Sequence, residues 1–179
     1  MTLDQWDKLS STIVSFVTVV AIFSGGLFAL IEYYGQKTDK KQSRSLTLVS
    51  EYHSRDTLIY RNRLDDAWEV GYPVLILTLN ENSDKSAAFN SYVNTLINEE
   101  QLSKDIDYLM GFYERLVTCV KAKLCDKTII DKFFLKNGRT FFRKYYPYVC
   151  SLRLKWKDES IWSNTEKYFN PGGVGKICI

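Results

Sequence analysis

The longest apolar stretch of the chain lies near its N-terminus and runs from Leu9 to Ile31. It contains no charged residue, and Lys8 and Glu32 flank it. As an α-helix, these 23 residues would extend about 34 Å, enough to cross the ~30 Å hydrocarbon core of a bilayer. The pattern predicts a transmembrane anchor over residues 9–34, preceded by a short extracytoplasmic tail over residues 1–8.

Basic residues follow this stretch at Lys37, Lys40, Lys41 and Arg44, and only Asp39 opposes them. Loops that stay in the cytoplasm carry an excess of Lys and Arg. The charge pattern therefore predicts a single-pass protein of the cell inner membrane, with the C-terminal part of the chain in the cytoplasm.

Three small residues, Ala21, Gly25 and Ala29, recur every four positions within the apolar stretch. Residues at this spacing share one helix face, and small side chains let a second backbone approach closely. We therefore expect the anchor to self-associate, so that the protein is a homo-oligomer.

The rest of the chain shows the three- and four-residue steps of amphipathic helices. We expect an all-α protein, with a stalk helix over residues 35–54, a break at Ser54, and a cytoplasmic helical bundle over residues 55–179. Gly71 and Pro73 should end the helix that follows Ser54. The apolar run 74–79 is too short to span a bilayer, and it is predicted to be a buried connecting segment or a short helix.

The clearest stripe of the bundle lies within residues 102–124 and predicts a packing seam between helices. Its members are Ile106, Leu109, Tyr113, Leu116 and Val120. Asp126 is expected to cap the next helix, and Asn137-Gly138 to stop it. Pro147 should kink or break the helix after that, and Asp158 should cap a last short helix.

Composition favours a folded domain without a metal or cofactor. Hydrophobic residues make up 45% of the chain and aromatic residues 15%, which argues against disorder. The single histidine, His53, and the absence of a C-x-x-C pair give no zinc-site pattern. In the cytoplasm the four cysteines should remain free, buried thiols. They are Cys119, Cys125, Cys150 and Cys178.

Several segments together resemble small bacterial single-span membrane proteins that carry an all-helical cytoplasmic domain of unknown function. The segments are residues 44–52, Ser54-Arg55-Asp56, Arg61, Arg63, Phe112-Tyr113-Glu114, residues 126–133, Phe142, Tyr145 and Pro147. This resemblance covers roughly residues 1–157. It implies an all-helical fold and no known activity, and it assigns no functional residue.

The strongest functional signal is a basic, aromatic stretch over residues 127–157, where nine Lys and Arg residues face only one acid, Asp131. Three interpretations remain open: a solvated face, attraction to anionic lipids, and a site for a nucleotide or nucleic acid. The candidate anion-binding residues are Lys136, Arg139, Arg143, Lys144 and Arg153. Arg61 and Arg63 lie among acidic residues and are expected to form helical ion pairs.

No nucleophile–base pair, metal-ligand set or phosphate-binding loop is present in the sequence, so we do not expect an enzyme. The pattern favours a membrane-anchored interaction or scaffold protein with a basic, aromatic cytoplasmic face. The alternative is an oligomeric membrane sensor-effector, of the antiphage-defence type, whose cytoplasmic domain binds an anionic nucleotide signal. The expected partners are the membrane, further copies of the chain, and an anionic lipid or nucleotide, and not nucleic acid.

Overall fold

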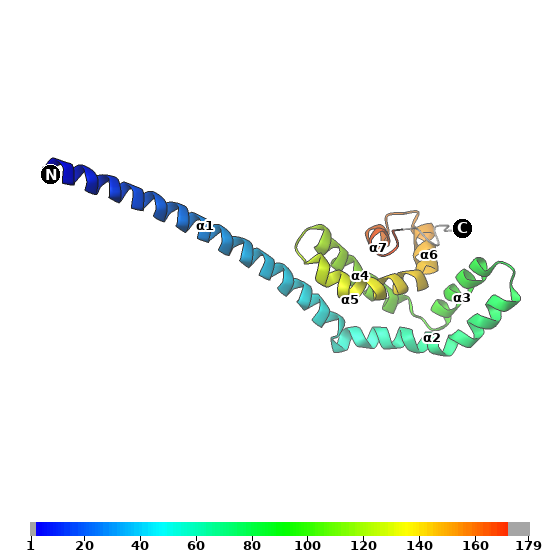
Figure 1. The fold of residues 1–179 in the computed structure, drawn as a ribbon. Helices are drawn as coiled ribbons and strands as arrows, with labels where there is room; N and C mark the ends of the chain where they lie inside the picture. The colour runs from blue at the N-terminus through cyan, green and yellow to red at the C-terminus, as the bar shows by residue number, and fades with distance from the viewer. Residues whose placement is uncertain (1–2, 172–179) are drawn as a thin grey trace. The chain divides into compact units, whose positions relative to one another are not determined.

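The computed structural model describes the backbone of residues 3–171 and the side chains of residues 24–171. In this part of the chain there are seven α-helices and no strand (Figure 1). They are α1 (Leu3–Tyr52), α2 (Arg55–Glu81), α3 (Lys85–Glu99), α4 (Ser103–Lys121), α5 (Lys127–Lys144), α6 (Tyr146–Trp156) and α7 (Ser163–Phe169). The prediction of an all-helical fold is confirmed.

The chain divides after Lys41 into two compact units. The first unit is helical, because α1 occupies it from Leu3 onward. The second unit begins at Gln42 and contains the closing residues of α1 together with α2–α7. Every packing interaction described below lies within this second unit, which we call the helical domain.

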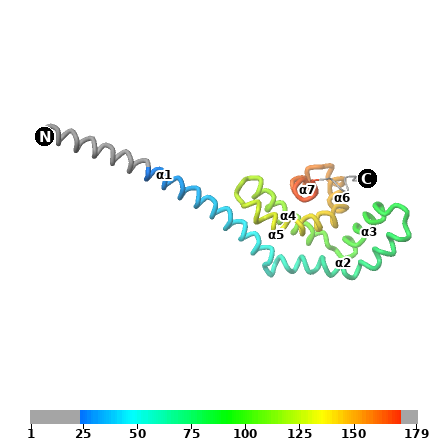
Figure 2. Tube along the Cα trace, viewed as in Figure 1, coloured from blue at the N-terminus to red at the C-terminus, as the bar shows by residue number. Residues whose placement is uncertain are grey.

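The predicted transmembrane anchor is contradicted. Residues 9–23 of that segment lie outside the residues whose side chains are described (Figure 2). Among the residues that are described, no helix combines the length and the apolar character needed to cross a membrane. From Ser24 onward α1 carries charged side chains at Glu32, Lys37 and Asp39, and it continues to Tyr52. The same finding overturns the predicted inner-membrane, single-pass location that depended on this anchor.

Helix α4 forms the centre of the helical domain and packs against α2, α5 and α7. The stripe predicted from the sequence faces inward: Ile106, Leu109, Tyr113 and Leu116 are all buried. The aromatic ring of Tyr52, at the end of α1, lies 5.4 Å from the ring of Phe112 and 5.2 Å from that of Phe134. The end of α1 is therefore part of the same core as α4 and α5.

Side-chain caps fix where several helices begin. Ser54 lies at the break between helices α1 and α2, and its hydroxyl accepts a 3.4 Å hydrogen bond from the Thr57 N–H. Asp126 caps α5 by accepting from the Thr128 and Ile129 N–H groups. Both boundaries follow the sequence-based predictions, since short polar side chains satisfy the N–H groups that a helix start leaves open.

The predicted end of the second helix at Gly71 and Pro73 is wrong, because α2 continues to Glu81 with Pro73 inside it. The apolar run 74–79 is thus the second half of a long helix that pairs with α3. Figure 1 shows α2 changing direction between its cyan and green halves. Gly71 leaves room for the Tyr92 hydroxyl, which donates a 2.5 Å hydrogen bond to the Gly71 carbonyl.

Gly138 does not stop α5, contrary to the prediction, but lies buried in the middle of the helix. A Cβ at this position would collide with the ring of Phe169 on α7, so the glycine allows these two helices to approach closely. The break predicted at Pro147 is confirmed, since α5 ends at Lys144 and Pro147 sits in the first turn of α6. The last helix begins at Ser163 rather than near Asp158.

The prediction of free thiols is also wrong. Cys119, in the last turn of α4, forms a disulfide with Cys125, which immediately precedes the α5 cap. Cys150 is disulfide-bonded as well. Cys178 lies outside the described residues.

Candidate anion-binding site

A cavity of about 350 Å³ opens in the helical domain, lined mainly by α2 and α5. Its lining residues come from the end of α1 (Tyr52), α2 (Arg61, Leu64, Asp65), α4 (Leu109, Tyr113) and α5 with its C-cap (Lys136, Asn137, Thr140, Phe141, Lys144, Tyr145). Cavities of about 300–1,000 Å³ are the usual size for small-molecule sites. The helical packing thus leaves room for one small ligand.

Helix α5 supplies one continuous face to this cavity. Lys136, Thr140 and Lys144 are spaced four residues apart, so they lie one above the other along the helix. Asn137 and Phe141 repeat the same spacing beside them. The α5 face therefore presents two ammonium groups, a hydroxyl and an amide to the same space.

Aromatic side chains form another part of the cavity lining. The hydroxyls of Tyr52 and Tyr113 lie 3.3 Å apart and are hydrogen-bonded, and the ring of Tyr113 lies 5.3 Å from that of Phe141. Burial raises the pKa of the Tyr113 phenol well above its usual range. Burial likewise raises the pKa of Tyr145, although a hydrogen bond from Trp68 opposes this shift. At neutral pH these phenols keep their protons and form a neutral, hydrogen-bonding wall.

Two of the cations are held against aromatic rings. The guanidinium carbon of Arg61 lies 4.1 Å from the ring centroid of Tyr52, and Arg61 also donates to the Tyr52 carbonyl at 3.4 Å. The Lys144 ammonium lies 4.8 Å from the ring centroid of Trp68. Cation–π contacts of this kind favour a fixed position for the charge. Arg61 is thus a cavity residue, and sequence reasoning assigned it only to helical ion pairs.

The cavity is electropositive. Three cations line it, Arg61, Lys136 and Lys144, against the single carboxylate of Asp65, which gives a formal charge of +3 − 1 = +2. A concave site lined by one sign of charge and by apolar walls concentrates ligands of the opposite charge. This arrangement is suited to a small anion that also carries a flat or apolar part.

The five predicted anion-binding residues do not gather in one place. Lys136 and Lys144 line the cavity. Arg139 and Arg143 are exposed and are not among its lining residues, because their positions on α5 fall off the cavity face. Arg139 and Arg143 show a four-residue spacing as well, so no sequence signal distinguishes the two pairs, and only the packing of the helical domain does.

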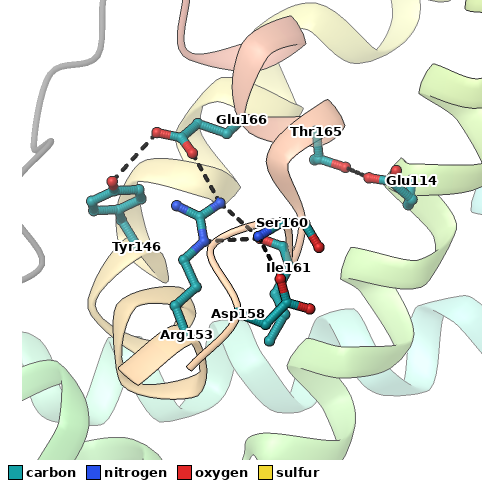
Figure 3. A network of polar contacts seen from close by, with 8 residues as sticks. All are labelled: Glu114, Tyr146, Arg153, Asp158, Ser160, Ile161, Thr165 and Glu166. Atoms are coloured by element: carbon teal, nitrogen blue, oxygen red, sulfur yellow. Dashed lines mark hydrogen bonds and ion pairs between the residues drawn. The ribbon is translucent and has the colours of Figure 1, made fainter. Parts of the chain in front are cut away.

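Arg153 does not line the cavity, and its contacts hold two parts of the domain together (Figure 3). Its guanidinium donates two hydrogen bonds, at 2.9 and 2.7 Å, to the Ile161 carbonyl, and it pairs with the Glu166 carboxylate at 2.9 Å. Only 10% of the Arg153 side chain and 15% of the Glu166 side chain are exposed. The Tyr146 hydroxyl donates to the other oxygen of Glu166 at 3.3 Å. Arg153 therefore ties α6 to α7 and the segment before it.

The residues predicted to mediate self-association are only partly described. Gly25 and Ala29 are exposed on α1 in the first unit, and a Cβ added to Gly25 would meet no atom within 4 Å. The side chain of Ala21 lies outside the described residues. Homo-oligomerisation through this face stays a prediction. Between residues 24 and 171, no three His, Cys, Asp or Glu side chains are grouped as metal ligands would be.

Comparison with known proteins identifies a family. The model of a domain of unknown function, DUF4760, matches residues 19–170. The chain belongs to the DUF4760 family. The match agrees with the predicted resemblance to a domain of unknown function, and it includes every residue that lines the cavity. No curated protein and no solved structure matches the chain. The DUF4760 description names no activity, so a functional proposal depends on the geometry of the site.

Proposed function

We propose that this DUF4760 domain is a non-enzymatic binding module that recognises a small anionic ligand, with nucleotides as the favoured class. The observation that carries the proposal is the meeting of Arg61, Lys136 and Lys144 at one cavity with aromatic walls. Ammonium and guanidinium groups form charge-assisted hydrogen bonds with phosphate oxygens. The proposal keeps the interaction role expected from the sequence and moves its site from an exposed basic face to a cavity.

A nucleotide fits this site better than a bare anion does, because the lining has two kinds of chemistry. Lys136 and Lys144 form a phosphate-binding edge. Asn137, Thr140 and Asp65 provide donors and acceptors that suit the edge of a base or a sugar. Inorganic phosphate would leave these polar groups and the aromatic wall without contacts.

The first test is a thermal-shift screen of the full chain with ATP, GTP, cyclic mononucleotides and cyclic dinucleotides. Inorganic phosphate and glycerol 3-phosphate, a phospholipid headgroup fragment, are included as comparison anions. A ligand at a hundred times its dissociation constant adds about 2.7 kcal/mol to the free energy of unfolding. For a domain of this size, that corresponds to an increase in Tm of about 5–10 °C.

The proposal expects at least one nucleotide to raise Tm by this amount, while phosphate at the same concentration has little effect. An equal shift with phosphate or glycerol 3-phosphate would contradict recognition of a nucleotide. A flat screen with a cooperatively unfolding protein would contradict the proposed function.

A further inference from the structure

The Cys119–Cys125 disulfide closes the turn between α4 and α5. This turn is also held by the backbone, because the N–H groups of Leu124 and Cys125 donate to the Cys119 carbonyl at 3.0 and 3.2 Å. These hydrogen bonds do not depend on the sulfur–sulfur bond. The two cysteines would therefore stay close together if the disulfide opened, so the bond could form again.

The two sulfur-bearing residues differ in access. Cys125 is only 4% exposed, whereas Cys119 is half-buried and lines an open hollow of about 580 Å³. Leu124, which also lines the hollow, is 48% exposed. A thiol that enters the hollow approaches the Cys119 side of the bond.

We propose that this disulfide is a thiol–disulfide exchange site, opened by a dithiol reductant that docks at the hollow. The reductant's thiolate attacks Sγ of Cys119, a mixed disulfide forms, and Cys125 leaves as a thiolate that takes up a proton. The second thiol of the reductant then attacks the mixed disulfide and releases Cys119. The protein gains two electrons and two protons, and the reductant becomes a disulfide.

A part-buried hydrogen bond connects the turn to α1. The backbone N–H of Asp126, next to Cys125, donates a 2.8 Å hydrogen bond to the Ser45 hydroxyl. Ser45 is fully buried in the helical domain. The disulfide restrains Cys125, and the next residue, Asp126, binds Ser45. Opening the bond removes this covalent restraint and leaves the turn held by hydrogen bonds alone, so we infer that residues 42–52 are then held less firmly. The redox state of the pair would thus change how firmly the end of α1 is held.

The exchange is tested on the full chain with dithiothreitol under native conditions, followed by alkylation with N-ethylmaleimide and peptide mapping. Cys150, which is disulfide-bonded and 8% exposed, is the internal control. We expect Cys119 to be labelled at least about ten times faster than Cys150, because attack requires access to a sulfur and Cys119 is half-buried whereas Cys150 is buried. Labelling no faster than that of Cys150, or only in urea, would overturn the proposal.

Two single variants test the side of attack. Cys125→Ser leaves the Cys119 thiol, and Cys119→Ser leaves the Cys125 thiol. With an aromatic disulfide reagent, we expect the Cys119 thiol to react at least about ten times faster, because it lines the hollow. Equal rates, or a faster Cys125 thiol, would overturn the assignment of Cys119 as the attacked residue.

Hydrogen exchange of the oxidised and reduced wild-type protein tests the connection to α1. Reduction should lower protection at Asp126 and in residues 42–52, while the α2–α3 pair keeps its protection. Unchanged exchange in residues 42–52 would overturn the connection. A uniform loss of protection throughout the domain would overturn it too, because it would mean general destabilisation.

Discussion

The indole N–H of Trp68 on α2 donates a 2.8 Å hydrogen bond to the phenol oxygen of Tyr145, the residue between α5 and α6. Trp68 is 8% exposed and Tyr145 is 2% exposed, so water does not replace this bond. The Lys144 ammonium lies over the face of the same indole ring. Through these contacts α2 fixes the end of the α5 face that lines the cavity.

Removing this hydrogen bond should destabilise the domain. Trp68→Phe keeps an aromatic ring but leaves the Tyr145 oxygen without its donor, and we expect a loss of about 1–3 kcal/mol in the free energy of unfolding. Urea denaturation provides the measurement. Trp162→Phe is the matched control, because the Trp162 indole N–H is buried without a hydrogen-bond partner among the described residues. Equal losses in both variants would show that ring size, and not the hydrogen bond, is responsible.

The close approach of α5 and α7 makes a second prediction. Gly138→Ala places a Cβ against the Phe169 ring, and overpacking of this kind costs about 1–3 kcal/mol. Gly111→Ala on α4 is the control, because its Cβ would meet nothing within 4 Å. Alanine has the better helix propensity by about 1 kcal/mol, so Gly111→Ala should be neutral or stabilising. A Gly138→Ala protein as stable as wild type would refute the close contact.

Arg153 should act in stability rather than in binding. Arg153→Leu removes the partner of the mostly buried Glu166 and both hydrogen bonds to the Ile161 carbonyl. Breaking a buried pair costs about 3–5 kcal/mol. Arg139→Leu, an exposed position on α5, should change the free energy of unfolding by less than about 0.5 kcal/mol. Similar thermal stability of the two variants would contradict the structural role.

Alkaline pH should weaken the fold through Tyr148. Burial, with the Asp107 carboxylate beside it, raises the pKa of Tyr148 to about 12. The unfolded phenol titrates near pH 10 and the folded one later, so the stabilisation is complete below pH 10 and is lost as the pH rises from about 10 to 12. Between pH 9 and pH 11, Tyr148→Phe should therefore lose about 1 kcal/mol less stability than wild type.

The comparison uses urea denaturation at both pH values. The Tyr72→Phe variant, at an exposed position, is the matched control for removing a phenol. An identical pH dependence in Tyr148→Phe and wild type would show that this phenol does not contribute.

Much of the fold is encoded locally and could be predicted. The breaks at Ser54 and Pro147, the cap at Asp126 and the inward stripe of α4 all follow from short-range rules about caps, proline and helical periodicity. The predictions that are wrong concern positions where contacts between helices, and not the local sequence, determine the structure. Gly71 and Gly138 are residues that often end helices. Here Gly71 makes room for the side chain of Tyr92, and Gly138 makes room for that of Phe169.

The site was only half predictable for the same reason. By charge alone, Arg139 and Arg153 are as good candidates for the anion-binding site as Lys136 and Lys144. A linear sequence does not show which cations come together from different helices. Arg61 is more than seventy residues before Lys136, and only the packing of α2 against the core brings both to one cavity. The disulfide was missed because its prediction depended on a topology that the structure contradicts.

The central claim is tested most directly by the dissociation constant of the nucleotide that gives the largest thermal shift. It is measured by calorimetry for wild type, Lys136→Gln/Lys144→Gln and Arg139→Gln/Arg143→Gln. Both variants remove two positive charges from α5, and only the first pair lines the cavity. Because a hydrogen bond to a charged group contributes about 1.5–3 kcal/mol and two such groups are removed, we expect the first variant to bind at least about a hundredfold more weakly. The second should stay within about threefold of wild type. Equal weakening in both variants, or none in either, would contradict recognition by the cavity.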